Sequence, residues 1–190
     1  MAEVIMKTLK NATLAIFRWR QTYGTNYQIY SGEEVYGSLT MSQQTLDSPF
    51  SIHTYDFYKG AAAAADDHFS FKCVLKNGYF SGCELLDQAT KSPLGEYRDY
   101  FLDLFGMPRG RVFLNSGLFY NWNRGIEKRQ WILSAPGGGD LLEFLTFKRQ
   151  DEGTIKVDRS IFLQVPDSRL LMLFGLYLSI NPRRYRIPAL

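Results

Sequence analysis

The chain has 190 residues, a length that suits one domain with a sizeable hydrophobic core, and we expect a single domain over residues 1–190. Hydrophobic residues make up 45% of it, which excludes an intrinsically disordered protein. The formal net charge of +3 argues against nucleic-acid binding, because such proteins carry a concentrated basic stripe.

The N-terminal residues include the acidic Glu3 and no apolar run of signal-peptide length. We therefore expect a cytoplasmic protein, which can also lie peripherally at a membrane. Cys73 and Cys83 are too few for a zinc site. The sequence favours two reduced strand cysteines, and the alternative is one disulfide across the hairpin that they flank.

Short segments rich in β-formers begin at residues 12–17 and recur along the chain, separated by Gly, Asn or Ser. The clearest signal is Asn77-Gly78, which lies between two such segments and favours a type I′ hairpin turn. The other predicted strands are residues 27–30, 35–39, 69–75, 79–83, 111–114, 118–122, 130–133, 142–147, 154–157 and 161–163.

Two segments depart from this strand pattern. The alanine run at residues 61–65 is of low complexity, and we expect an inserted surface loop or a short helical turn there. From Glu96, about ten residues carry apolar side chains at helical spacing, which predicts a short amphipathic helix that ends before Pro108.

A second predicted helix covers Ser168–Ile180 and is apolar on every face. Such a helix must be surrounded by protein or lipid, and its length of about 20 Å is too short to cross a bilayer. The surround must then be the preceding strands. We expect a mainly β fold, an antiparallel closed or nearly closed barrel that encloses this hydrophobic C-terminal helix.

The strand-rich chain that leads through residues 162–168 into an apolar helix resembles the tubby C-terminal-like superfamily, especially its LURP-one-related and scramblase-like branch. Residues 27–37, and residues 83–87 through 93–95, resemble the strand, polar turn, strand unit of that family. The resemblance implies a twelve-stranded barrel around a hydrophobic helix. For some members it also implies binding to acidic lipid headgroups.

No catalytic constellation is visible in the sequence. His53 and His68 lie in no nucleophile or metal motif, and we expect neither a catalytic residue nor a cofactor or metal. Residues 136–140 are rich in glycine but lack the Lys-Ser/Thr of a phosphate-binding loop, so they predict a hairpin turn.

Several basic residues recur near the predicted turns and are candidates for binding an anionic headgroup. They are Arg109, Arg111, Arg124, Lys128 and Arg129. Scattered surface charge is the alternative explanation for them. Arg183, Arg184 and Arg186 follow the apolar helix, where they can interact with its dipole or with a membrane.

The sequence thus favours a non-enzymatic binding domain that engages a protein partner or an anionic, phosphoinositide-type membrane surface. A carrier barrel for a small apolar ligand is one alternative, although a central helix occupies the space that such a ligand needs. An enzyme whose site is assembled only by the fold is another.

Overall fold

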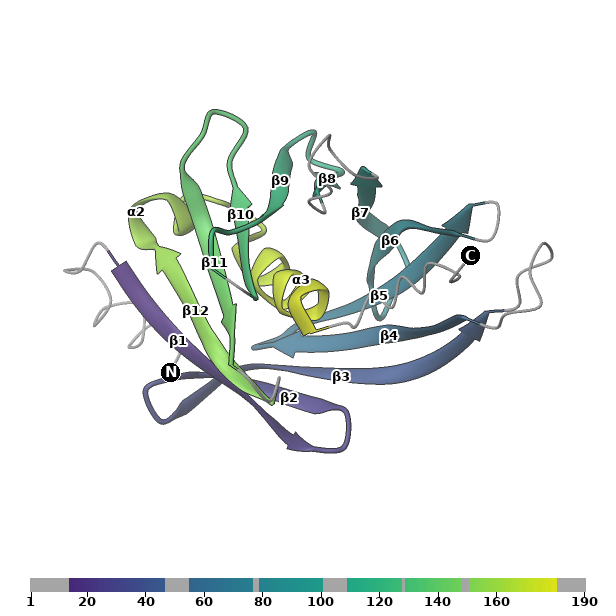
Figure 1. Cartoon of the computed structure of the whole chain (residues 1–190), viewed down its shortest axis with the longest axis horizontal. Helices are drawn as coiled ribbons and strands as arrows, with labels where there is room; N and C mark the ends of the chain where they lie inside the picture. The colour runs from purple at the N-terminus through teal and green to yellow at the C-terminus, as the bar shows by residue number, and fades with distance from the viewer. Residues whose placement is uncertain are drawn as a thin grey trace.

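The computed structural model describes residues 14–46, 55–76, 79–100, 109–127, 129–147 and 151–180. Twelve antiparallel strands form a closed barrel around the helix α3 (Figure 1). The strands are β1 (Leu14–Tyr23), β2 (Asn26–Ser31), β3 (Glu34–Leu46), β4 (Tyr55–Ala64), β5 (Asp67–Lys76), β6 (Tyr79–Asp87), β7 (Pro93–Tyr100), β8 (Arg109–Leu114), β9 (Phe119–Arg124), β10 (Gln130–Ser134), β11 (Asp140–Thr146) and β12 (Glu152–Asp158).

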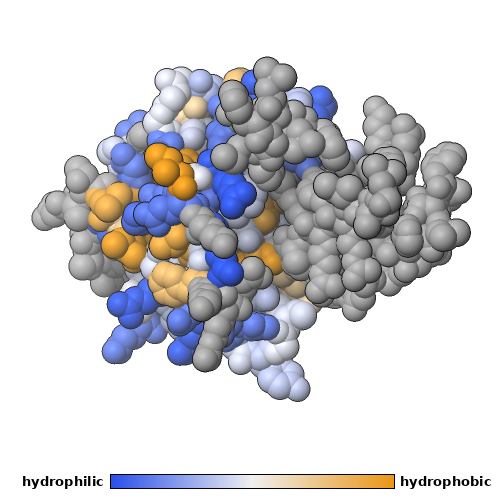
Figure 2. Space-filling view, viewed as in Figure 1, coloured by the Kyte–Doolittle hydropathy of each residue, from blue (hydrophilic) through white to orange (hydrophobic). Residues whose placement is uncertain are grey.

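Each strand pairs with its neighbours in the sequence, and the pairing of β1 with β12 closes the ring. The side chains alternate between the two faces of the wall. On β1, Ala15 and Phe17 are buried, whereas Ile16 between them is 58% exposed. Figure 2 shows hydrophilic and hydrophobic residues interspersed on one outer face of the molecule. The apolar side chains thus meet inside the barrel.

The helix α3 (Ser168–Ile180) fills the barrel interior, as the sequence predicted. Leu171, Leu173 and Leu176 are 0% exposed although they lie on different sides of the helix. The main-chain carbonyl of Asp167 accepts the first helical hydrogen bond from the amide of Leu171 at 3.0 Å. Among the described residues, no helix is long and apolar enough to cross a membrane.

The wall of the barrel beside α3 is built from small residues. Residues 61–64 of the alanine run belong to β4, where Ala62 and Ala64 are buried, so the expectation of a surface loop or helical turn was wrong for them, and only Ala65 lies in the exposed β4–β5 turn. A Cβ on Gly60 would lie 3.0 Å from Cδ2 of Tyr177, and a Cβ on Gly37 would lie 3.3 Å from Cδ2 of Leu173. Small side chains on β3 and β4 therefore let α3 approach the wall closely.

Two other predictions about secondary structure were wrong. Residues 96–100 belong to the strand β7, and not to an amphipathic helix, because they pair with both β6 and β8. The rest of that predicted helix, residues 101–108, lies outside the described residues. The predicted strand at residues 161–163 is replaced by the short helix α2 (Arg159–Phe162), which follows β12 directly.

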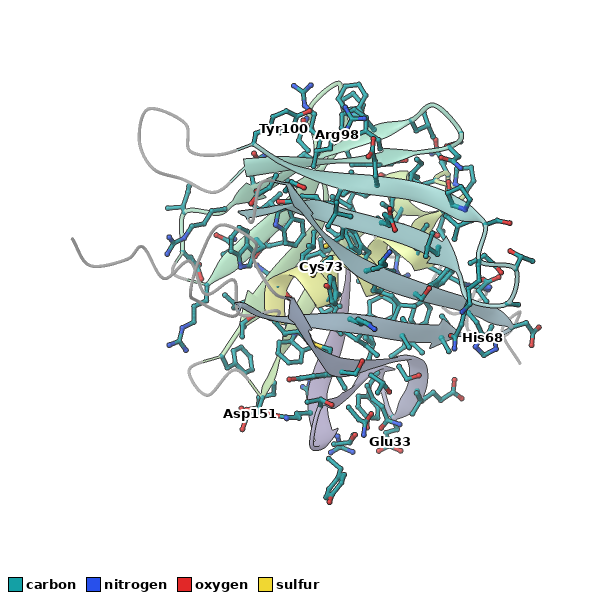
Figure 3. The ribbon with its side chains drawn as sticks, turned by 90° about the vertical axis from the view of Figure 1, so that its right-hand side faces the viewer. Glu33, His68, Cys73, Arg98, Tyr100 and Asp151 are labelled. Carbon is teal, nitrogen blue, oxygen red and sulfur yellow. The ribbon has the colours of Figure 1, made fainter. Side chains whose placement is uncertain are left out.

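The hairpin predicted around Asn77-Gly78 has the expected strands, because β5 and β6 pair up to Lys76 and Tyr79. Residues 77 and 78 themselves lie outside the described residues. Cys73 and Cys83 are direct cross-strand partners on this hairpin, and both are buried. Their sulfur atoms lie 3.1 Å and 3.9 Å from the hydroxyl of Tyr177 on α3, so they belong to the core. Figure 3 shows Cys73 in the barrel wall over α3.

Candidate anion-binding surface

The outer face of β7, β8 and β9 combines arginines with aromatic rings. Strand alternation turns Val112 and Leu114 of β8 into the core and leaves Arg111 on the exposed face. On β7, the same alternation buries Tyr97 and exposes Arg98. We call this surface the arginine–aromatic stripe; its members are Arg98, Tyr100, Arg111, Phe113 and Phe119.

Arg98 and Arg111 are direct cross-strand partners in the pairing of β7 with β8. The guanidinium carbon of Arg98 lies 5.0 Å from the ring centroid of Phe113. That of Arg111 lies 5.6 Å from the ring of Tyr100 and 5.3 Å from the ring of Phe119. Figure 3 shows Arg98 and Tyr100 beside each other at one edge of the barrel. The rings thus hold both guanidinium groups through cation–π contacts.

Only part of the positive charge in the stripe is neutralised by its described contacts. Arg98 forms an ion pair with Glu96, whose hydrogen bond and negative charge raise the pKa of the guanidinium. Arg111 instead donates from Nε to the neutral amide oxygen of Asn121 at 3.2 Å. Like charges directly opposite each other destabilise a sheet. The stripe therefore places two guanidinium cations opposite each other, and the carboxylate in its described contacts is that of Glu96, which is bound to Arg98.

The five predicted basic residues are placed differently by the fold. Arg111 lies in the stripe, and Arg109 is the first residue of β8, paired with Tyr100 on one side and Asn123 on the other. Arg124 is exposed at the end of β9. Arg129 lies in the β9–β10 turn, where its Nη1 donates to the carbonyl of Phe147 at 3.1 Å. Lys128 lies outside the described residues.

Sequence reasoning missed Arg98, together with Tyr100. Both fall in the segment that was expected to be helical, and residues two positions apart do not share a face of a helix. A signal was present, because the polar Glu96 and Arg98 alternate with Gly95 and Tyr97, although Asp99 interrupts the pattern before Tyr100. A strand-period test of residues 94–100 would have put Arg98 and Tyr100 on one face.

A cavity of about 870 Å³ lies at the end of the barrel where α3 begins. Its walls include Phe17 and Tyr36, whose ring centroids are 4.9 Å apart. At its rim, Arg169 donates from Nη1 to Asp67 at 2.9 Å. Burial raises the pKa of the Asp167 carboxyl, which also lines the cavity. This end of the barrel thus offers an apolar space with charged groups at its mouth.

The remaining sequence candidates have structural roles or lie elsewhere. His68 is exposed on β5, and His53 lies outside the described residues, as do Arg183, Arg184 and Arg186. The glycine-rich segment forms the predicted β10–β11 turn, in which the amide of Gly138 donates to the carbonyl of Ala135 at 3.1 Å. In the described part of the chain, no three His, Cys, Asp or Glu residues gather as metal ligands.

Comparison with family models, with curated proteins and with solved structures finds no match to this chain.

Proposed function

We propose that this barrel binds an anionic membrane surface through the arginine–aromatic stripe. The observation that carries the proposal is the direct opposition of Arg98 and Arg111 on neighbouring strands, each held over aromatic rings. A phosphate group placed between the two guanidinium groups would accept hydrogen bonds from both and relieve their repulsion.

The surroundings of the stripe favour a lipid surface over a protein partner. Two further basic residues belong to the ends of these strands, because Arg109 begins β8 and pairs with Asn123, and Arg124 ends β9. An extended basic region gains affinity from many negatively charged headgroups at once, about fivefold for each cation near the surface. A protein partner remains the alternative that the experiment below distinguishes.

We also propose that the chain belongs to the tubby C-terminal-like superfamily. The support is a twelve-stranded antiparallel barrel closed around an apolar helix that follows all the strands in the sequence. Fold-level likeness by itself is a weak argument for function. The proposal of membrane binding therefore depends on the stripe and does not require this kinship.

Sedimentation with vesicles tests the proposal. Vesicles of phosphatidylcholine alone are compared with vesicles that also contain phosphatidylserine or phosphatidylinositol bisphosphate. We expect binding only to the anionic vesicles, weakening with salt because the interaction is electrostatic. Replacing Arg98 and Arg111 with Gln should lower the affinity about 25-fold, at about fivefold for each cation.

A matched control keeps the net charge equal. Arg18 and Arg20 are exposed on β1, which β9, β10, β11 and β12 separate from β8. Changing both to Gln should lower the affinity for anionic vesicles by no more than about twofold, a loss that comes from the lower net charge. Equal losses in the two double variants would show that net charge alone drives binding and would refute the role of the stripe. Absence of binding to every vesicle would refute membrane binding and favour a protein partner.

The cavity beside α3 supports a second candidate function, the binding of a small amphipathic ligand. The helix fills the middle of the barrel, but about 870 Å³ at its end falls within the usual size of a ligand pocket. Four acidic and two basic residues line the cavity, and this excess of negative charge favours a ligand with a cationic head group and an apolar body. They are Glu34, Asp67, Asp87, Arg159, Asp167 and Arg169.

Calorimetric titration with 4-phenylbutylamine, 4-phenylbutanol and 4-phenylbutyrate compares three head groups on one apolar body. We expect the amine to bind most tightly and the carboxylate most weakly. Leu163 lines the cavity and is 49% exposed, so Leu163→Trp should obstruct the space without disturbing the core. Lack of binding by all three compounds would eliminate this candidate, and tightest binding of the carboxylate would reverse the assigned charge preference.

A further inference from the structure

The turn between β9 and β10 exposes an isoleucine completely. Ile126 has a relative exposure of 104%, the largest among the exposed large hydrophobic residues that the structure describes. Scattered exposed apolar residues are common on protein surfaces, so exposure alone carries no function. The surroundings of Ile126 are what distinguish it.

Hydrogen bonds fix the turn that carries Ile126. The amide of Gly125 donates to the carbonyl of Gln130 at 2.9 Å, and the amide of Gln130 donates to the carbonyl of Glu127 at 3.2 Å. The amide of Glu127 also donates to Oε1 of Gln130 at 2.9 Å. Because these hydrogen bonds already order the turn, its apolar side chain loses little conformational freedom when it moves from water into a membrane.

Cations flank Ile126 in the sequence. Arg124 precedes it, and Lys128 and Arg129 follow it, with Glu127 as the single acidic residue, so residues 124–129 carry a formal charge of +2 (three basic minus one acidic). Asn123, next to Arg124, pairs with Arg109 on the strand that carries Arg111. The isoleucine therefore belongs to a basic turn at the end of the barrel where β8 begins.

We infer that Ile126 inserts into the interfacial region of an anionic bilayer while the stripe and Arg124 bind the headgroups. This inference rests on the proposed function, and it adds an orientation: the β9–β10 turn leads, and the opposite end of the barrel, with the cavity, faces away. Transfer of an isoleucine side chain out of water strengthens partitioning by about tenfold or more. A soluble anion offers no apolar phase and cannot use this residue.

Tryptophan placed at this position reports insertion directly. Trp19 and Trp122 are buried in the core, and Trp131, the cross-strand partner of Arg124, is partly buried. Ile126→Trp therefore adds an exposed fluorophore to a background that is measured on the parent protein with the same vesicles. The matched control is Ile16→Trp, since Ile16 is 58% exposed on β1, which β9, β10, β11 and β12 separate from β8. Both variants are mixed with phosphatidylserine-containing vesicles whose phosphatidylcholine carries brominated acyl chains, which quench only nearby tryptophan.

Relative to the parent protein, we expect strong quenching and a blue shift for Ile126→Trp and neither change for Ile16→Trp. Ile126→Asn should weaken vesicle binding about tenfold and leave the binding of free inositol hexaphosphate unchanged. If vesicles bind through Arg98 and Arg111 while Ile126→Trp is unquenched, the insertion fails and the proposed function stands. If the two tryptophan variants are quenched equally, the orientation is wrong. If the parent binds no vesicle, both proposals are overturned.

Discussion

Gly175 provides a sharp test of the helix inside the barrel. It lies in the middle of α3, where alanine is normally preferred over glycine by about 1 kcal/mol. A Cβ at this position would lie 2.5 Å from Cε2 of Phe144 on β11 and closer still to Cζ. Because an ordinary carbon–carbon contact is about 3.5–4.0 Å, the ring would have to move by about 1 Å or more.

The ring of Phe144 has little room to move. It is 0% exposed, and its centroid lies 5.5 Å from that of Trp122. Overpacking of a filled core costs about 1–3 kcal/mol, and this site belongs at the upper end of that range. After the gain of about 1 kcal/mol in helix propensity, Gly175→Ala should lower the free energy of unfolding by about 2 kcal/mol. The melting temperature should fall by about 4–8 °C.

Urea unfolding followed by circular dichroism measures this change, and a double-mutant cycle assigns it. Phe144→Leu should cost about 1–2 kcal/mol alone, and Gly175→Ala should cost at least about 1 kcal/mol less in that background than in the parent. Gly137→Ala is the control, because no atom lies within 4 Å of its Cβ position, and it should change stability by less than about 0.5 kcal/mol. A stabilised Gly175→Ala protein would refute the packing of α3 against β11.

Two further predictions concern the same core. Leu173→Asp should leave the protein insoluble or unfolded, because Leu173 is 0% exposed and the new carboxyl group would be buried without a partner. Leu163→Asp, on the surface, should remain folded. A soluble Leu173→Asp protein that unfolds cooperatively would contradict the central helix. Burial raises the pKa of Tyr177 above its ordinary value of 10.0, so the unfolded chain loses the hydroxyl proton at a lower pH than the folded protein. The free energy of unfolding should therefore fall as the pH rises above about 10, by about 1.4 kcal/mol per pH unit. Urea unfolding between about pH 9 and pH 11 should show a shallower decline for Tyr177→Phe, and identical slopes for both proteins would disprove this linkage.

The sequence was most informative where apolar patterning admits one explanation. A segment of 13 residues that is apolar all round has to be enclosed, and the strand-rich remainder of the chain left only a barrel to enclose it. The same reasoning failed for the alanine run. Residues 61–65 carry too little side chain to look like a buried strand, and their smallness makes sense only once α3 lies against β4.

Local periodicity was also ambiguous at β7. Aromatic residues at positions 97, 100, 101 and 105 fit one face of a helix, and the pairing of β7 with β6 and β8 overrides that pattern. The error concealed the stripe, because Arg98 meets Arg111 only through the register of two strands. Basic residues could be listed from the sequence, but their grouping depends on strand pairing between distant segments.

The order of the elements along the chain has a consequence for synthesis. All twelve strands leave the ribosome before α3, and β1 must wait for β12 before the ring can close. Until α3 follows, the inward residues of the strands have nothing to pack against in the centre, so a nascent chain exposes a broad apolar surface while it is still incomplete. Ring closure and helix entry should therefore occur together and late, and the incomplete chain is prone to aggregation until they do.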